Sequence, residues 1–99
     1  MPAAYIIAQV RVDDPEGYRN YTDRTPALIE KWGGQFLVRG GRTEVMEGEP
    51  IGNRTVLLRF PSMEQALDFY HSDDYAELRA IRQAHSEAQF LIVEGVPET

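Results

Sequence analysis

Arginine is the residue type in this 99-residue chain whose chemistry is easiest to place, because the sequence carries nine arginines and a single lysine. A guanidinium presents a planar fork of N–H donors that matches a carboxylate. Arg39 is the first candidate, since it ends a short apolar segment and precedes Gly40-Gly41, which lets other backbone come close. It could bind a ligand carboxylate or enolate. It could equally pair with Glu44 or Glu47 across a turn, and the sequence leaves both roles open.

Five more residues are candidates for the same ligand site. Glu47 could act as a general base if desolvation raised its pKa, or it could be a salt-bridge partner. Arg54 and Arg59 bracket an apolar segment, where each could contact an anion or form an ion pair. The remaining two, Gln9 and Tyr5, lie in an N-terminal segment and share one face of its predicted strand.

A second set of candidates lies in the later helical part of the chain: His71, Tyr75 and Arg82. The two histidines, His71 and His85, have no carboxylate at metal-ligand spacing. His71 fits a partner of a helix dipole better than a catalyst, and His85 fits a packed residue. The chain has no cysteine, no Gly-x-Ser-x-Gly elbow and no phosphate-binding glycine motif. We therefore expect neither a metal nor a cofactor.

Length and charge limit the classes of protein to consider. Ninety-nine residues fit one domain spanning residues 1–99. The net charge of −6 disfavours a nucleic-acid partner. The N-terminus lacks the charged-then-apolar layout of a signal peptide, and the longest apolar runs are too short to span a membrane. We expect a cytoplasmic protein without a membrane partner.

The first half of the chain predicts a strand, a long helix and a hairpin. Residues 4–12 are rich in β-branched side chains and predict a strand. Asp14-Pro15 starts a helix, and Pro26 inside it should kink the helix or remove a hydrogen bond. Gly33-Gly34 ends this helix, and a strand over 35–39 turns through Gly40-Gly41 into a second strand over 43–47. The helix carries one buried stripe at helical spacing: Tyr18, Tyr21, Thr25, Leu28, Ile29 and Trp32.

The second half predicts a strand, a bent pair of helical pieces and a final strand. Residues 54–60 form the strand. Ser62 with Gln65 fits a capping box, and a second start signal at Ser72 predicts a bend. The last strand covers roughly residues 88–94. Several helical aromatic residues could line a pocket, although at this spacing such residues usually belong to the core: Tyr18, Tyr21, Trp32, Tyr70 and Tyr75.

The order β-α-β-β-α-β predicts an α+β, ferredoxin-like sandwich with an antiparallel sheet whose helices cover one face. Strand alternation assigns an apolar set of residues to that covered face. The other set is mixed, too apolar for water and too polar for a dry core, and it suits a homodimer in which two sheet faces enclose a polar cavity. The mixed set is Tyr5, Ile7, Gln9, Arg11, Gln35, Leu37, Arg39, Thr55, Leu57 and Arg59.

The chain also resembles a known family, the domain of unknown function 1330, over nearly its whole length. The residues that carry the resemblance are Asp14-Pro15, Tyr21, Trp32-Gly33-Gly34, Arg39-Gly40-Gly41, Glu47-Gly48, Arg54, Phe60-Pro61-Ser62, Ala66, Tyr70, Ser72, Tyr75, Arg82 and Glu94-Gly95. The resemblance implies the dimeric α/β-barrel arrangement and no established reaction. One departure is Arg59, where the family usually carries an acid before Phe-Pro-Ser.

Two hypotheses for function follow. The first is a dimeric domain that binds a small anionic or aromatic molecule on the sheet face. The second is a cofactor-independent enzyme, similar to a monooxygenase or an isomerase, that acts on a small aromatic or acidic metabolite. Wider relatives implied by the resemblance include monooxygenases, haem-degrading enzymes and muconolactone isomerases, so the fold alone does not choose between the two.

Overall fold

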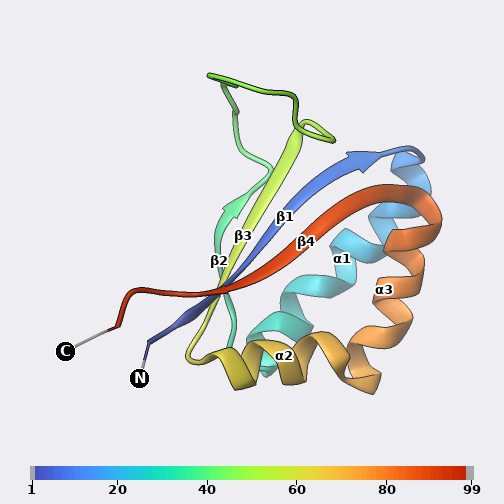
Figure 1. Ribbon diagram of the computed structural model, residues 1–99. Coiled ribbons are helices and arrows are strands. Elements are labelled where there is room, and N and C mark those ends of the chain that lie inside the picture. Colours follow the sequence, from blue (N-terminus) through green and yellow to red (C-terminus); the bar gives the residue numbers. More distant parts are fainter. Residues whose placement is uncertain (1, 98–99) are drawn as a thin grey trace.

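The computed structural model describes residues 2–97, which form a four-stranded sheet covered on one face by three helices (Figure 1). The elements follow in the order β1 (Ala4–Val12), α1 (Pro15–Lys31), β2 (Gln35–Arg39), β3 (Arg54–Phe60), α2 (Met63–His71), α3 (Asp73–His85) and β4 (Ser86–Glu94). The strands lie in the order β2-β3-β1-β4, and every neighbouring pair is antiparallel. The predicted ferredoxin-like α+β fold is confirmed.

The long helix α1 begins and ends where the sequence predicts. Pro15 is at its start, and Gly33 follows its end with a φ of 84°, a conformation that glycine adopts without strain. Asp14 is at the N-cap position, but its side chain makes no capping hydrogen bond. Its carboxylate instead lies 3.1 Å from Nδ1 of His85, at the far end of α3. Asp14 therefore joins two helices rather than capping one.

The junction between α2 and α3 confirms the predicted bend at Ser72. Its side-chain oxygen accepts a hydrogen bond from the Tyr75 N–H at 3.1 Å, which caps α3 as α2 ends. At the start of α2, Ser62 accepts from the Gln65 N–H at 3.1 Å, the first half of the predicted capping box. The second half is absent, because the Gln65 amide donates to the Trp32 carbonyl at 2.9 Å. Gln65 thus ties α2 to the end of α1.

The predicted strand over residues 43–47 is wrong. Residues 41–51 are all exposed, and the chain between β2 and β3 forms a loop that projects beyond the sheet (Figure 1). β2 pairs directly with β3, and the Gly40 N–H donates to the Thr55 carbonyl at 2.9 Å. A strand over 43–47 would have no covered face on which to bury its apolar side chains. The last strand, β4, starts at Ser86, two residues before the predicted start.

A β-bulge in β2 changes which residues face the helices. Phe36 pairs with Leu58, but Val38 pairs with Leu57, so Leu37 is an extra residue without a partner. An extra residue moves every following side chain to the opposite face. Arg39 therefore lies on the helix-covered face, and its predicted place on the open face is wrong. Val38 correspondingly lies on the open face and is 40% exposed.

On the open face of the sheet, paired residues of neighbouring strands form rows that run across the sheet, which we call rungs. An apolar rung runs through Val38, Leu57, Ile7 and Leu91, and beside it lies a mixed rung of Gln35, Arg59, Tyr5 and Val93. At the other end of the sheet, the Gln9 amide donates to the Thr55 hydroxyl at 2.6 Å. Arg11 forms an ion pair of 2.6 Å with Glu87. Gln9, Tyr5 and Arg59 thus lie on this face, as predicted.

Candidate functional site

A cavity of about 30 Å³ lies between α1 and the helix-covered face of the sheet. Its floor is apolar and comes mainly from β1 and β3, including Ile6, Ala8 and Leu58. Its walls carry the phenols of α1 and α3, which are Tyr18, Tyr21 and Tyr75. One water molecule needs about 10–15 Å³, so the enclosed part has room for about two waters or for one small charged group.

Arg39 lies at the exposed edge of this cavity, held by a hydrogen bond to the backbone of α1. Its Nη2 donates to the Thr22 carbonyl at 2.8 Å. In an uninterrupted helix that carbonyl would accept from the N–H of residue 26, but Pro26 has none. The sequence predicted a lost hydrogen bond at Pro26, and Arg39 occupies the acceptor that the proline leaves open. The guanidinium carbon also lies 4.7 Å from the centre of the Phe36 ring.

Arg54, from the start of β3, lines the cavity beside Arg39. Its side chain occupies the space next to Gly40, where a Cβ atom would collide with the Arg54 guanidinium. Gly40 also has a φ of 67°, which favours glycine. The guanidinium carbon lies 6.0 Å from the centre of the Tyr18 ring, and Nε is buried without a hydrogen-bond partner. Gly40 thus leaves room for a second cation, Arg54, in the lining of the same cavity.

The phenols at the inner end form a hydrogen-bonded pair. The hydroxyl oxygens of Tyr21 and Tyr75 are 2.6 Å apart, and both side chains are buried. Burial raises the pKa of Tyr21 well above its ordinary value. Burial also raises the pKa of Tyr75, although its hydrogen bond with Tyr21 and the charge of Arg82 oppose this. Both phenols are therefore neutral at physiological pH.

Arg82 is a buried cation behind these phenols. It comes from α3, is 4% exposed, and its guanidinium carbon lies 4.0 Å from the centre of the Phe90 ring. Its Nε has no hydrogen-bond partner. Burial opposes the charge of Arg82, but the phenolic oxygens of Tyr75 and Tyr21 favour it, and the balance raises its pKa. The sequence offered no signal for this burial beyond the helical spacing of Tyr75 and Arg82.

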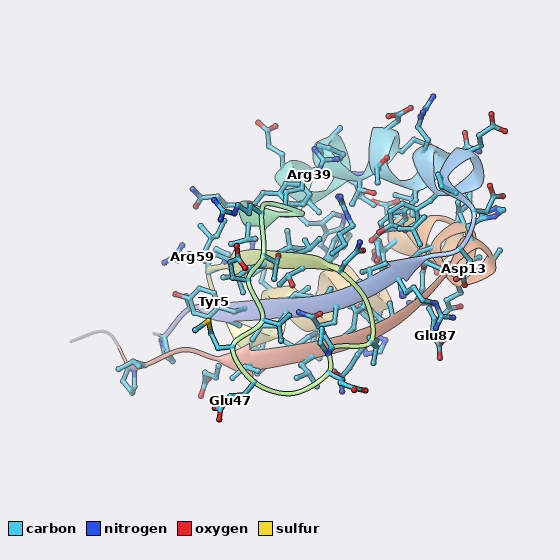
Figure 2. The ribbon with its side chains drawn as sticks, turned by 90° about the horizontal axis from the view of Figure 1, so that it is seen from above. Tyr5, Asp13, Arg39, Glu47, Arg59 and Glu87 are labelled. Carbon is cyan, nitrogen blue, oxygen red and sulfur yellow. The ribbon has the colours of Figure 1, made fainter. Side chains whose placement is uncertain are left out.

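No carboxylate within residues 2–97 forms an ion pair with Arg39, Arg54 or Arg82. Glu44, one predicted partner of Arg39, lies 2.8 Å from Arg42 instead. The other, Glu47, projects with the exposed loop and lies far from Arg39, which lies beside α1 (Figure 2). The predicted Arg39–glutamate pair is therefore wrong, and the cavity carries positive charge without a compensating acid.

The structure divides the predicted site residues into three groups. Arg39, Arg54 and Tyr75 line the cavity, and Arg82 is buried behind it. Gln9, Tyr5 and Arg59 lie on the opposite face of the sheet, and Figure 2 shows Tyr5 and Arg59 over the strands. Glu47 lies in the loop, and His71 is exposed at the end of α2 with its ring against Tyr70. Tyr18 and Tyr21, assigned mainly to the core, are the two phenols of the cavity that the candidate set lacked.

No helix within the described part of the chain is long and apolar enough to cross a bilayer. Across residues 2–97, no group of three or more histidine, cysteine, aspartate or glutamate side chains is placed to hold a metal ion.

Comparison with solved structures finds the same fold in several proteins. A protein of unknown function from Rhodopseudomonas palustris superposes with a TM-score of 0.78 at 15% identity, covering 98% of this chain and 85% of that one. SnoaB, a cofactor-independent oxygenase from Streptomyces nogalater, gives 0.65 at 11% identity over 100% and 97% of the chains. A putative antibiotic biosynthesis monooxygenase from Nitrosomonas europaea gives 0.61 at 13% identity over 100% and 96%. At these identities the likenesses establish the fold alone.

The sequence itself has a family match. Among curated proteins no match is found. Residues 3–96, however, match the family described as Domain of unknown function (DUF1330), the family that the motifs around Arg39-Gly40-Gly41 and Phe60-Pro61-Ser62 predict. Since this match covers almost the entire chain, the protein belongs to the DUF1330 family.

Proposed function

We propose that this protein binds a small molecule through its acidic group, which enters the cavity between α1 and the sheet and pairs with Arg39 and Arg54. The observation that carries this proposal is that Arg39 and Arg54 line the same cavity and have no carboxylate partner among residues 2–97. Arg54 is partly buried, and such a cation loses hydration that only an anion or a set of acceptors restores. A bound carboxylate would restore it to Arg54 and would also pair with the exposed Arg39.

The size of the cavity limits how the ligand is placed. An enclosed volume of about 30 Å³ accommodates a carboxylate group but is too small for an aromatic ring. The rest of the molecule would therefore lie at the opening, against Phe36 and the aliphatic part of Arg39. This placement differs from the sequence-based hypothesis, which put the ligand on the open face of the sheet.

The residues around the cavity favour binding over catalysis by proton abstraction. The lining groups include hydroxyls and guanidiniums, and they include no carboxylate or imidazole. A general base must lie within hydrogen-bond reach of the proton that it removes. The cofactor-independent enzyme, our second hypothesis, would therefore need a substrate that is already deprotonated.

Calorimetric titration with sodium acetate and sodium benzoate tests the proposal. Arg39→Met and Arg54→Met should each weaken carboxylate binding about tenfold or more, since a hydrogen bond to a charged group contributes about 1.5–3 kcal/mol. Arg42→Met is the matched control, because Arg42 pairs with Glu44 in the exposed loop. Carboxylate binding no stronger than that of chloride at equal ionic strength would contradict the proposal.

We also propose that a second copy of the chain covers the open sheet face and forms a homodimer. Large apolar side chains on this face are exposed: Val38 and Leu91 of the apolar rung are 40% and 49% exposed, and Val93 of the mixed rung is 45% exposed. Apolar rungs of this kind in a folded sheet are usually covered by another layer. The Gln9–Thr55 hydrogen bond and the Arg11–Glu87 ion pair satisfy polar groups at one end of the same face. These features suit the rim and centre of a self-complementary interface.

Sedimentation velocity at micromolar concentration tests the dimer. Leu91→Glu would place one acid on the apolar rung of each copy and should produce a monomer. Leu67→Glu is the control, because Leu67 is 39% exposed on helix α2, away from the open face. A monomeric wild-type protein would refute the homodimer and leave the cavity proposal unaffected.

A further inference from the structure

The hydroxyls of Tyr21 and Tyr75, at the inner end of the cavity, have one proton more than their shared hydrogen bond uses. Tyr21 and Tyr75 carry two hydroxyl protons, and one of them is shared between the oxygens at 2.6 Å. Tyr21 makes no further hydrogen bond with residues 2–97, whereas the Tyr75 hydroxyl has the guanidinium of Arg82 as a further partner. Since both residues line the cavity, the second proton is directed to whatever the cavity holds.

Arg82 determines which phenol supplies that proton. It follows Tyr75 by two helical turns on the same face of α3, and its charge acts most strongly on the Tyr75 hydroxyl. A guanidinium has no acceptor, so the Tyr75 oxygen turns its lone pairs toward Arg82 and its proton away. That proton is then donated to the Tyr21 oxygen. The Tyr21 proton remains for the cavity.

Donors predominate among the unused polar groups around the cavity. They are the Tyr21 hydroxyl, Nε of Arg54 and the N–H groups of Arg39 that do not bind Thr22. The lone pairs of the Tyr18, Thr22 and Thr25 hydroxyls are the acceptors beside them. Donors without acceptors are satisfied by a group that has lone pairs and no proton of its own. A carboxylate, an enolate or a phenolate fits this requirement, whereas an amide or an alcohol offers fewer lone pairs and adds donors of its own.

We propose that the inner end of the cavity is an oxyanion site in which Tyr21 donates to the charged oxygen of the ligand and Arg82 acts as a positioning residue through Tyr75. This inference rests on the proposed function and adds to it the protonation state of the ligand. The site selects the deprotonated form of a weak acid and discriminates against a neutral group of the same shape. Tyr21 contacts the ligand, and Arg82 does not.

Acetate and acetamide test whether the site selects a charged group over a neutral one. They have nearly the same size, but acetamide is neutral and carries N–H donors. Wild-type protein should bind acetate at least about tenfold more tightly than acetamide. Tyr21→Phe should reduce that preference about tenfold, since it removes the donor and keeps the ring. Arg82→Met should reduce it by a smaller factor, and Arg82→Lys should restore part of it.

The pKa of bound acetate provides a readout that a purely structural role would not change. With ¹³C-labelled acetate, the carboxyl chemical shift across acidic pH should give a pKa below that of free acetate in the wild type. In Tyr21→Phe the pKa should move back toward the free value. Circular dichroism at each pH confirms that each variant remains folded.

The outcomes distinguish this inference from the proposed function. Equal acetate affinity in the wild type and in Arg39→Met would refute the proposed function itself. Acetate binding that depends on Arg39 but is unchanged in Tyr21→Phe, with an unchanged pKa of the bound acetate, would refute the oxyanion site alone. Equal affinity for acetamide and acetate would also refute it.

Discussion

The contribution of the Arg39–Thr22 hydrogen bond to stability can be measured by replacing Pro26, whose missing N–H leaves the Thr22 carbonyl free to accept from Arg39. Replacing Pro26 by alanine restores an N–H that can donate to the Thr22 carbonyl within the helix. Proline inside a helix costs about 3 kcal/mol relative to alanine, and it lowers the entropy of the unfolded chain by about 0.4–1 kcal/mol. Because Arg39 already satisfies the carbonyl, we expect Pro26→Ala to stabilise the protein by about 1–2 kcal/mol.

The matching change is Arg39→Met, which keeps a long side chain over Phe36 and removes the donor. A hydrogen bond from a charged donor contributes about 1.5–3 kcal/mol, and we expect about 1 kcal/mol here because Arg39 is exposed and water competes. When residue 26 is alanine, the carbonyl has its helical partner, and Arg39→Met should cost only about 0.3 kcal/mol. The coupling energy is then roughly 0.7 kcal/mol.

Urea unfolding of the four proteins in this double-mutant cycle, followed by circular dichroism, is the assay. For a chain of this size, 1 kcal/mol corresponds to a change in Tm of about 4–8 °C, so thermal unfolding provides a second reading. Arg42→Met in both backgrounds is the control and should show no coupling. If Arg39→Met costs the same with proline and with alanine at position 26, the reasoning about the released carbonyl is refuted.

Three further predictions concern the same region. Gly40→Ala should displace the Arg54 guanidinium and strain a backbone with a φ of 67°. Carboxylate binding should weaken about as much as in Arg54→Met, and an unchanged affinity in titration calorimetry would contradict this. Gly34→Ala would place a Cβ 2.6 Å from a core phenyl atom and should destabilise by about 1–3 kcal/mol, whereas Gly41→Ala, which meets nothing within 4 Å, should be close to neutral in urea unfolding. Burial raises the pKa of Tyr21 above its unfolded value, so the stability this phenol contributes is present below about pH 10 and lost as the pH rises through the folded value. Tyr21→Phe should flatten the loss of stability measured above pH 10, and an unchanged slope would count against a buried neutral phenol.

The fold was predictable because local signals agreed with one another. Helix α1 begins at Pro15 and ends before Gly33, and Ser72 separates α2 from α3. The apolar alternation of β1 identifies the face that the helices cover. Each signal depends on residues close together in the chain, and each fits the ferredoxin-like order. The strand predicted over residues 43–47 failed because the Gly40-Gly41 turn leads into an exposed loop rather than a hairpin.

The candidate site was harder to predict because it depends on a single extra residue. Strict alternation from Gln35 puts Arg39 on the open face, and the bulge at Leu37 reverses that assignment. The sequence has no glycine or proline at the bulge to reveal it. Pro26 offered an indirect clue, since a released helical carbonyl needs a donor, but only the folded chain brings Arg39 to it.

The aromatic part of the site shows a second limit of sequence reasoning. Helical spacing correctly predicts that Tyr18, Tyr21 and Tyr75 are buried. Spacing cannot distinguish a phenol packed in a core from one whose hydroxyl faces a cavity. That distinction depends on the contact between α1 and α3, which joins residues that are 54 positions apart.

We propose that an acidic group binds between Arg39 and Arg54, on the helix-covered side of the sheet. A crystal structure of the protein grown with sodium acetate, refined beside one grown with sodium chloride alone, tests it most directly. We expect a carboxylate within hydrogen-bond distance of both guanidinium groups and of the Tyr21 hydroxyl. Acetate bound instead at Arg59 or Arg11 on the open face, or a cavity that holds only water, would contradict it.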